Sequence, residues 1–244
     1  MLILNAGVPR SGTVLVNAMI RGLLKQAGIG VVQVNPHGRE LPVTVAELKR
    51  IGHYRHRPVL VHTHSWDRDT QTMLTGDPHV LAMANYRDPR DVCVSLMKLH
   101  DLEFDDTVTA VKSYYGAFEA VVRALGAMVI PYEMLVASPT AHCFQIARHL
   151  GLWPTFEQVD EVVATTSMDR HRKVMEDVRN GDVAQLVERQ NRNRTLREDQ
   201  QTLINDRHIQ SGASGRWRSE LTDGQQEAAA EKFASIIERY GFPD

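Results

Sequence analysis

The sequence predicts an α/β fold, in which a central and mainly parallel β-sheet of about five strands is flanked by helices. Two observations lead to this prediction. Short apolar runs alternate with amphipathic helical patterns over roughly the first 135 residues, and a glycine-containing loop joins the first apolar run to the first helical pattern. Strands that alternate with helices pair in parallel through crossover connections, which places helices on both faces of the sheet.

Five apolar runs have the length and composition of buried strands. They lie near residues 2–6, 30–34, 58–62, 79–85 and 127–131. The helical patterns between them lie near residues 13–27, 43–51, 68–75, 89–100 and 106–125. After residue 135 the pattern is helical, near residues 138–150, 156–164, 168–178 and 222–240. Parallel sheets of this kind bind ligands at the carboxyl ends of their strands, so we expect the functional residues there.

The length of 244 residues predicts a single domain, 1–244, with a full hydrophobic core. The stretch 180–206 differs from the rest because it is very polar, with arginines spaced among glutamines and asparagines. Few apolar residues are available to anchor it. We therefore expect a mobile lid or loop there rather than a linker between domains.

Composition and charge exclude several classes of protein. The net charge of −2 gives no reason to expect nucleic acid or a membrane as a partner. No apolar run reaches the roughly 20 residues of a membrane span, and the first run starts too early to leave room for a signal peptide. Cys93 and Cys143 fall in helical patterns and predict buried thiols in a reducing, cytoplasmic compartment. The spacing of the histidines and cysteines indicates no metal site.

The first motif is the loop from Gly7 to Thr13, between the apolar run at residues 2–4 and a helical pattern that starts at Val14. In this arrangement the backbone N–H groups at the helix N-terminus bind a phosphate. The two glycines are spaced as in a Walker A loop, which makes the predicted fold similar to the three-layer sandwich of P-loop NTPases. Thr13-Val14 stands where that motif has Lys-[Ser/Thr], however, so the loop predicts a phosphorylated donor other than ATP.

The second motif is Tyr86 to Ser95, after the apolar run that ends near residue 85. Asp88 is a good helix N-cap and Pro89 suits the first helical position. Arg87 should therefore lie at the carboxyl end of a strand, and Ser95 two turns into the next helix. A guanidinium and a hydroxyl suit a phosphate, although an arginine at a strand end is more often a surface salt-bridge residue.

The third motif is a strand that ends in His62 and His64, which we expect to point to opposite faces of the sheet. A histidine at this edge is well placed to act as a general base, and a purely structural histidine is the alternative. The fourth motif contains Gly212 and Gly215, followed by Trp217. Glycines three apart let a backbone approach a ligand closely, and a loop with a packed tryptophan is the alternative.

In this order and spacing, the four motifs make the sequence resemble the sulfotransferases that use 3′-phosphoadenosine 5′-phosphosulfate (PAPS) and release adenosine 3′,5′-bisphosphate (PAP). The resemblance covers nearly the whole chain. It implies that the first loop binds the 5′-phosphosulfate, through Arg10, Ser11, Gly12, Thr13 and Val14. It further implies that Arg87 and Ser95 bind the 3′-phosphate, and that His64 supplies the base.

The resemblance also extends to the residues around the nucleotide. The segment from Gly212 through Ala213 and Gly215 corresponds to the family's closing loop. Tyr132 follows a strand end as the family's Tyr-Glu segment does. Thr166-Ser167-Met168 resembles the Thr-Ser-Phe that lines the adenine.

Three positions depart from the family pattern. Gln210-Ser211 replaces an Arg-Lys pair, Leu15 replaces an aromatic residue, and His62 replaces a lysine.

The implied reaction moves a sulfuryl group from PAPS to a hydroxyl or amine of a small-molecule or carbohydrate acceptor, without a metal. Arg10 would stabilise charge rather than donate a proton, because an arginine pKa exceeds about 12. Two alternatives stay open: a P-loop small-molecule kinase, and a catalytically silent nucleotide-binding protein of the same fold. The acceptor and the oligomeric state have no decodable signal in the sequence.

Overall fold

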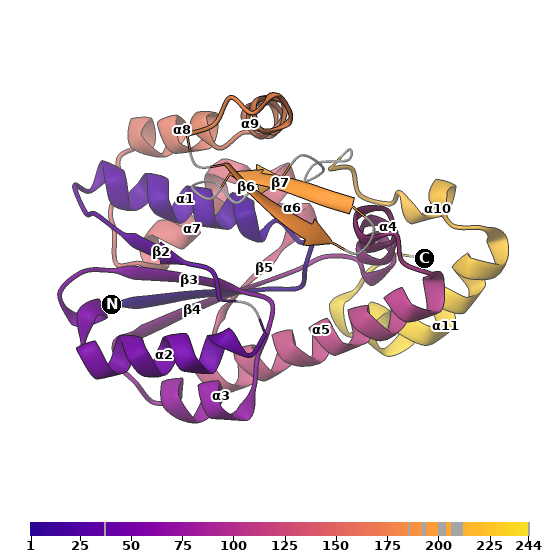
Figure 1. Ribbon diagram of the computed structural model, residues 1–244, viewed down its shortest axis with the longest axis horizontal. Helices are drawn as coiled ribbons and strands as arrows, with labels where there is room; N and C mark the ends of the chain where they lie inside the picture. Colours follow the sequence, from indigo (N-terminus) through magenta and orange to yellow (C-terminus); the bar gives the residue numbers. More distant parts are fainter. Residues whose placement is uncertain (37, 185, 192–193, 200–203, 206–211, 244) are drawn as a thin grey trace. The chain divides into compact units, whose positions relative to one another are not determined.

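The computed structural model describes residues 1–36, 38–184, 186–191, 194–199, 204–205 and 212–243 (Figure 1). The chain divides into two compact units, each built from two stretches of sequence. The first unit holds Met1–Arg87 and Lys112–Val163, and the second holds Asp88–Val111 and Ala164–Asp244. The expectation of a single domain, 1–244, stays a prediction.

The first unit is built on a five-stranded parallel sheet with the strand order β2-β3-β1-β4-β5. The strands are β1 (Leu2–Ala6), β2 (Val32–Val34), β3 (Val59–Thr63), β4 (Val80–Tyr86) and β5 (Met128–Pro131). Every residue of the central strands β1 and β3 is buried, which is why both begin as continuous apolar runs. The predicted fold class, a mainly parallel sheet flanked by helices, is confirmed.

One face of this sheet holds a large hydrophobic core cluster. The helices that cover it are α1 (Thr13–Gln26), α7 (Pro139–His149) and the part of α8 (Phe156–Thr165) that belongs to this unit. Ile20 of α1, Ile146 of α7 and Val159 of α8 pack there with Ile3 and Leu60 of the sheet. In Figure 1 the helices α2 (Glu40–Ile51) and α3 (Arg68–Leu74) lie together on the opposite side of the sheet. The core therefore anchors the helix that follows the first loop.

Three further elements complete the first unit. A single 3-10 turn (His53–Arg55) precedes β3, and the short helix α6 (Tyr132–Ala137) follows β5 directly. The long helix α5 (Phe104–Leu125) begins in the second unit and continues into the first.

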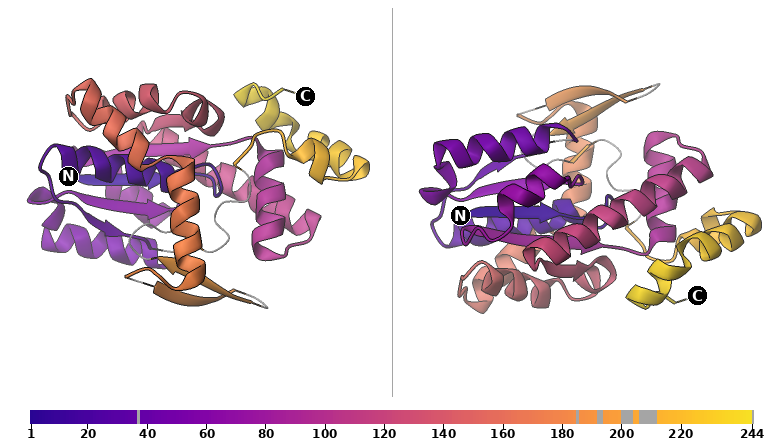
Figure 2. Two further views of the ribbon diagram at one scale, coloured as in Figure 1. Left: turned by 90° about the horizontal axis from the view of Figure 1, so that it is seen from above. Right: turned by 90° about the horizontal axis from the view of Figure 1, so that it is seen from below.

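The second unit combines helices with a small antiparallel sheet. Its helices are α4 (Pro89–His100), α9 (Met168–Asn180), α10 (Trp217–Glu220) and α11 (Asp223–Tyr240). The sheet has the order β6 (Leu186–Asn191), β7 (Arg194–Asp199), β8 (Ile204–Asn205). Figure 2 shows this sheet beside α9, with which β7 and β8 are in contact. The helix α4 contacts α10 and α11.

Most predicted elements are confirmed, with ends that differ by a few residues. The three strands in the stretch 180–206 were not predicted, because that stretch lacks the apolar alternation that marks a strand. Its behaviour as a lid stays a prediction. In the part of the chain that the structure describes, no helix combines the length and the apolar character needed to cross a membrane.

The burial predicted for Cys93 and Cys143 is confirmed, and both are free thiols. Burial raises the pKa of each thiol to about 12. At neutral pH both stay protonated, which makes them poor nucleophiles and poor metal ligands.

Candidate donor and transfer site

The first loop joins β1 to α1 in a conformation that its residues specify closely. Gly12 is the N-cap of α1 with φ 84°, and Arg10 also lies in the left-handed region with φ 68°. A non-glycine residue there is strained, and such strain is concentrated at functional sites. Gly12 has no side chain with which to cap α1, and the first turn of the helix holds no acidic residue. The first N–H groups of the helix are therefore suited to an anion.

Two hydrogen bonds and one close backbone contact hold the same loop in place. The buried Ser11 hydroxyl donates to the carbonyl oxygen of Val8 at 2.5 Å, and the Val8 N–H donates to the carbonyl of Asn85 at 2.9 Å. A Cβ at Gly7 would lie 2.9 Å from both the backbone nitrogen and the Cβ of Asn85, and 2.8 Å from Cγ2 of Thr13. Only glycine fits at this position.

Gly7→Ala is expected to lower the free energy of unfolding by about 1–3 kcal/mol, because the new methyl group overpacks the junction of loop and sheet. Thermal or urea unfolding measures the loss. Gly116→Ala is the matched control, since an added Cβ there meets nothing within 4 Å. Gly116 lies in α5, so its substitution should leave stability unchanged or raise it by up to about 1 kcal/mol. Equal stabilities of the two variants would contradict the packing argument.

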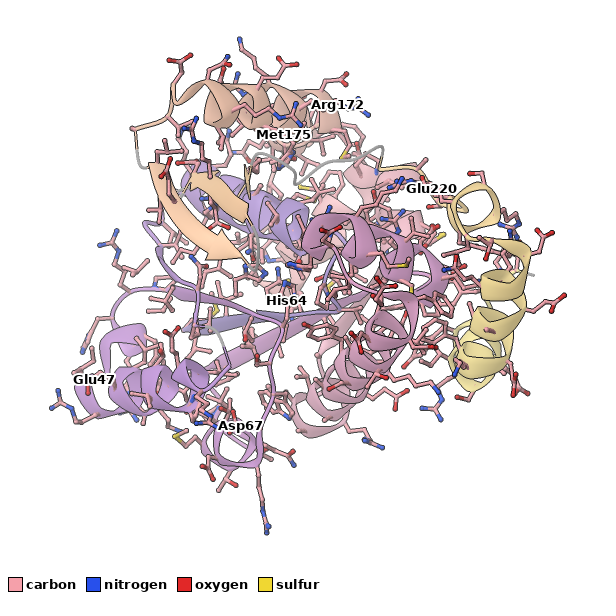
Figure 3. The ribbon with its side chains drawn as sticks, turned by 45° about the vertical axis from the view of Figure 1, so that its right-hand side comes forward. Glu47, His64, Asp67, Arg172, Met175 and Glu220 are labelled. Atoms are coloured by element: carbon pink, nitrogen blue, oxygen red, sulfur yellow. The ribbon has the colours of Figure 1, made fainter. Side chains whose placement is uncertain are left out.

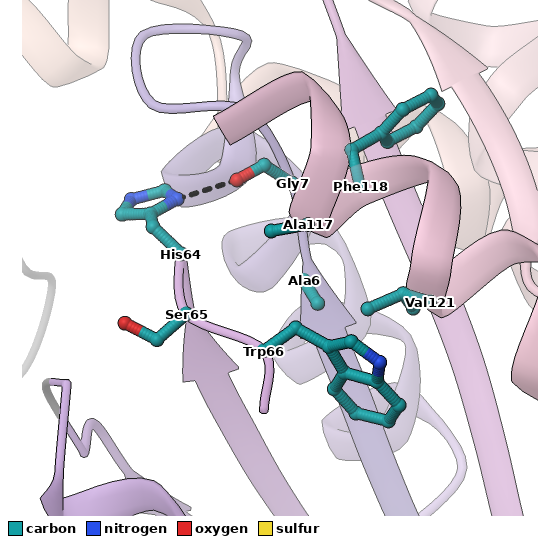
Figure 4. Close-up of a pocket in the computed structure, with 8 residues that line it drawn as sticks. All are labelled: Ala6, Gly7, His64, Ser65, Trp66, Ala117, Phe118 and Val121. Carbon is teal, nitrogen blue, oxygen red and sulfur yellow. Dashed lines mark hydrogen bonds between the residues drawn. The ribbon is translucent and has the colours of Figure 1, made fainter. Parts of the chain in front are cut away.

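His64, which is labelled in Figure 3, follows the last residue of β3, and the dashed line in Figure 4 marks its bond to this loop. Its Nδ1 lies 2.7 Å from the carbonyl oxygen of Gly7. A carbonyl oxygen only accepts, so Nδ1 carries the hydrogen and donates it. In the neutral ring the lone pair then lies on Nε2. The loop thus sets the tautomer that leaves Nε2 as the atom able to take a proton.

The prediction that His62 and His64 point to opposite faces is wrong. Their rings are in edge contact, with centroids 4.9 Å apart and an interplanar angle of 84°. Side chains alternate along a strand, so residues two apart share a face. His62 is buried, and it lies directly beside the candidate base.

Arg87 follows β4, as predicted, and is buried beside the loop. Its guanidinium stacks over the Tyr132 ring, 4.4 Å from the centroid, and donates to the carbonyl oxygen of Arg10 at 3.4 Å. The Tyr115 hydroxyl donates to the carbonyl oxygen of Arg87. The planar guanidinium fork matches the geometry of a phosphate, so an arginine at this edge of the sheet is able to bind an anion.

The first unit therefore brings the predicted residues of the first loop, Arg10, Ser11, Gly12, Thr13 and Val14, together with His64, Arg87 and Tyr132. Gly12 packs closely in the same place, because a Cβ there would lie 3.0 Å from Cδ2 of Tyr132.

A pocket opens beside His64, and Figure 4 shows the side chains that line it. It holds about 170 Å³ of empty space, part of which is open to solvent. Apart from His64 and Ser65, its lining is Ala6, Gly7, Trp66, Ala117, Phe118 and Val121. The indole Nε1 of Trp66 is buried, and none of the described residues accepts a hydrogen bond from it. A group that reached the base from this side would meet mainly apolar surface.

The second unit holds the other predicted site residues. Ser95 is buried in α4, two turns from its start, as predicted. Gly212 and Gly215 have φ of 74° and 77°, with Ala213 between them. The N–H groups of Gly215 and Trp217 donate to the Asp91 carboxylate at 2.7 and 3.1 Å. Asp91 lies one turn before Ser95, so the closing segment is bonded to the helix that holds Ser95.

Thr166 and Met168 also belong to the second unit. Thr166 is buried, and Met168 is the first residue of α9, whose N-cap Ser167 accepts from the N–H of Arg170 at 3.3 Å. Gln210 and Ser211, which replace the family's Arg-Lys pair, lie outside the described residues. Within the described ranges, no three His, Cys, Asp or Glu side chains gather as a metal ion would require.

Three solved structures each cover 97% of this chain. A mouse sulfotransferase, SULT7A1, complexed with PAP, aligns with a TM-score of 0.65 at 13% identity over 84% of its own chain. The chain has the fold of this sulfotransferase. Retinol dehydratase with androsterone and inactive cofactor PAP aligns at 0.59, with 15% identity over 80% of its chain. Retinol dehydratase with retinol and PAP aligns at 0.58, with 14% identity over 81% of its chain.

No protein-family model and no curated protein matches the sequence. At 13–15% identity the solved structures establish the sulfotransferase fold alone.

Sequence reasoning missed three residues of this region, namely Tyr115, Asp91 and Trp66. Tyr115 and Trp66 are aromatic residues, which the sequence alone places only in the core. Asp91 looks like an ordinary acidic residue in the first turn of a helix, where the helix dipole favours a negative charge. Only the tertiary contacts of these residues distinguish them.

Proposed function

We propose that the protein is a PAPS-dependent sulfotransferase that moves a sulfuryl group to a hydroxyl or amine of a small-molecule or carbohydrate acceptor. The observation that supports this most is the hydrogen bond from His64 Nδ1 to the Gly7 carbonyl oxygen. It ties a candidate base to an anion-binding loop that lacks the lysine of a kinase. Base and loop are then held in one arrangement before any substrate binds.

In this proposal the loop residues bind the 5′-phosphosulfate, chiefly through the first N–H groups of α1, with Arg10 as a cation beside them. The glycine-capped N-terminus of α1 and the buried guanidinium of Arg87 suit a nucleotide that carries anionic groups at both its 5′ and its 3′ positions. The resemblance assigns the 3′-phosphate to Arg87 and Ser95. It assigns the rest of the nucleotide to Tyr132, Thr166, Met168, Gly212, Ala213 and Gly215.

The transfer step needs a base and charge stabilisation. His64 Nε2 takes the proton of the acceptor as the acceptor oxygen or nitrogen forms its bond to sulfur. The bond between sulfur and the bridging phosphate oxygen breaks, and its electrons stay with the departing PAP. Arg10 and the loop N–H groups stabilise the negative charge that grows on the leaving phosphate. These protein groups complete the step, so the proposal requires no metal.

The acceptor class is proposed as small and hydroxyl- or amine-bearing. The apolar lining of the pocket beside His64 supports an acceptor whose reactive group is attached to an apolar body. The complexes of retinol dehydratase with androsterone and retinol support the same class. We also propose a cytoplasmic location, which agrees with the two buried free thiols.

The test is calorimetric titration with PAP, beside a separate titration with ATP and Mg²⁺. We expect PAP to bind with micromolar or tighter affinity and ATP to bind much more weakly, because ATP has no 3′-phosphate. Transfer of labelled sulfuryl from PAPS to a panel of alcohols, phenols, sugars and amines then identifies the acceptor. Failure of folded protein to bind PAP would overturn the proposal. Mg²⁺-dependent ATP turnover would indicate a kinase, and PAP binding without any transfer would indicate a silent nucleotide-binding protein.

A further inference from the structure

The first turn of α4 holds a buried carboxylate, that of Asp91. Asp91 is 1% exposed, and its two oxygens accept from different backbone groups of the closing segment. Oδ2 accepts from the N–H of Gly215 at 2.7 Å, and Oδ1 accepts from the N–H of Trp217 at 3.1 Å. A carboxylate this deeply buried is stable only where hydrogen bonds compensate its charge. These two bonds give that compensation and hold residues 215–217 against α4.

The tryptophan of the same segment makes stacking contacts with two arginines. The Trp217 ring has the guanidinium of Arg90 at 3.9 Å from its centroid and that of Arg218 at 4.2 Å. Arg90 is itself held by Asp88, which accepts from its Nε at 3.0 Å and from its Nη2 at 2.8 Å. Asp88 is the N-cap of α4, so these contacts connect Trp217 to the start of this helix.

A third link runs through Glu220 on α10, which is labelled in Figure 3. Its carboxylate pairs with Arg216 at 2.7 Å and with Lys98 on α4. Desolvation raises the pKa of Glu220, and the hydrogen bonds and charges of Lys98 and Arg216 outweigh it, so the pKa is lowered. The segment from Gly215 to Glu220 is therefore bonded to α4 at its start and at its end.

The position of Asp91 on α4 places the bonded segment close to a residue proposed to bind the donor. Ser95 lies four residues further along α4, and residues four apart share one face of a helix. Asp91 thus holds Gly215 on the face that bears the hydroxyl proposed to bind the 3′-phosphate. Gly215 has φ 77°, a backbone conformation that favours glycine. Position 215 therefore adds no side chain to the helix face that bears Ser95.

We propose that Asp91 is a positioning residue for the donor nucleotide, because it preorganises the closing segment Gly212–Trp217 beside Ser95. This inference rests on the proposed function. Asp91 acts through the Gly215 and Trp217 N–H groups, which it orients before the nucleotide arrives. Preorganisation of this kind improves affinity by removing the cost of ordering the segment upon binding.

The test is Asp91→Asn, which has nearly the same shape. The asparagine keeps one acceptor oxygen but turns an NH₂ group toward the second N–H, so one of the two bonds is lost. We expect the Kd for PAP, measured by calorimetry, to rise by about tenfold to a hundredfold, because the segment must then be ordered upon binding at a cost comparable with that of one charge-assisted hydrogen bond. The kcat at saturating PAPS and the KM for the acceptor should stay unchanged, because Asp91 is proposed to act only through donor binding.

Asp223→Asn is the matched control. Asp223 lies in the first turn of α11 in the same unit and is exposed, and the variant makes the same change of charge. It should bind PAP as the unchanged protein does. A purely structural role for Asp91 would lower the melting temperature of Asp91→Asn and leave the Kd of the folded protein unaltered.

A measurement on the unchanged protein covers the case in which Asp91→Asn does not fold. The amide hydrogens of Gly215 and Trp217 should exchange slowly with solvent before PAP is added. Unprotected exchange of both amides would overturn the inference. So would equal PAP affinity of Asp91→Asn and the unchanged protein. If the unchanged protein does not bind PAP, the proposed function fails, and the inference fails with it.

Discussion

His64→Asn is expected to lower kcat by about 10²–10⁴-fold, the range typical of removing a general base. The asparagine NH₂ group can still donate to the Gly7 carbonyl oxygen, which His64 Nδ1 contacts at 2.7 Å. The loop should therefore keep its arrangement, and the Kd for PAP should stay nearly unchanged. Steady-state kinetics at saturating PAPS, together with calorimetry, separate the two effects.

The pH profile distinguishes a base from a purely structural histidine. With His64 present, kcat should rise with pH, since only the neutral ring accepts a proton. This dependence should disappear in His64→Asn. His56→Asn, at an exposed position, is the control and should keep both the rate and the profile. A His64→Asn variant with unchanged turnover would remove this residue from the mechanism.

The elements that the sequence predicted well have signals confined to a few neighbouring residues. The run Leu2–Leu4 has no polar residue to interrupt it, and β1 is buried throughout. Asp88-Pro89 combines a good cap with a residue suited to the first helical turn, and the Asp88 side chain accepts from the N–H of Arg90 at the start of α4.

The small sheet of the second unit shows why other elements could not be predicted. Strands β6 and β7 pair in a register that sets Glu188 opposite Arg197, and the two side chains form an ion pair at 3.1 Å. Each residue alone is simply polar, and neither strand has an apolar face that repeats every second residue. The pattern becomes meaningful only when the partner strand is known, because cross-strand pairs stabilise such a sheet.

In the candidate site, too, local sequence signals could be predicted and contacts between distant residues could not. Sequence order and spacing were enough to place Arg10, His64 and Arg87 at the carboxyl ends of three strands of one sheet. They could not predict that Gly7 bonds to His64 or that Asp91 bonds to the closing segment, because these contacts join residues 57 and 124 positions apart. The tautomer of His64 follows from the first of these contacts, so it could be inferred only from the three-dimensional structure.

Arg87→Ala is expected to weaken PAP binding by about 10- to 100-fold, the loss that follows when a charged hydrogen-bonding group to a phosphate is removed. Affinity for adenosine 5′-monophosphate, which lacks the 3′-phosphate, should change much less. The ratio of the two Kd values is the quantity to measure, because a general disturbance of the loop would weaken both nucleotides alike. Such a disturbance is a real alternative, since Arg87 also donates to the carbonyl oxygen of Arg10 and stacks on Tyr132.

Arg87→Lys separates charge from shape. A lysine keeps the positive charge but lacks the planar fork, so it cannot bind a phosphate through two parallel hydrogen bonds or stack as flatly on Tyr132. We expect its PAP affinity to fall between those of Arg87→Ala and the unchanged protein. If Arg87→Ala weakens PAP and adenosine 5′-monophosphate equally, Arg87 only supports the loop, and the 3′-phosphate must be held by other residues. If only PAP is weakened, Arg87 is what makes this site prefer PAPS over a nucleotide without a 3′-phosphate.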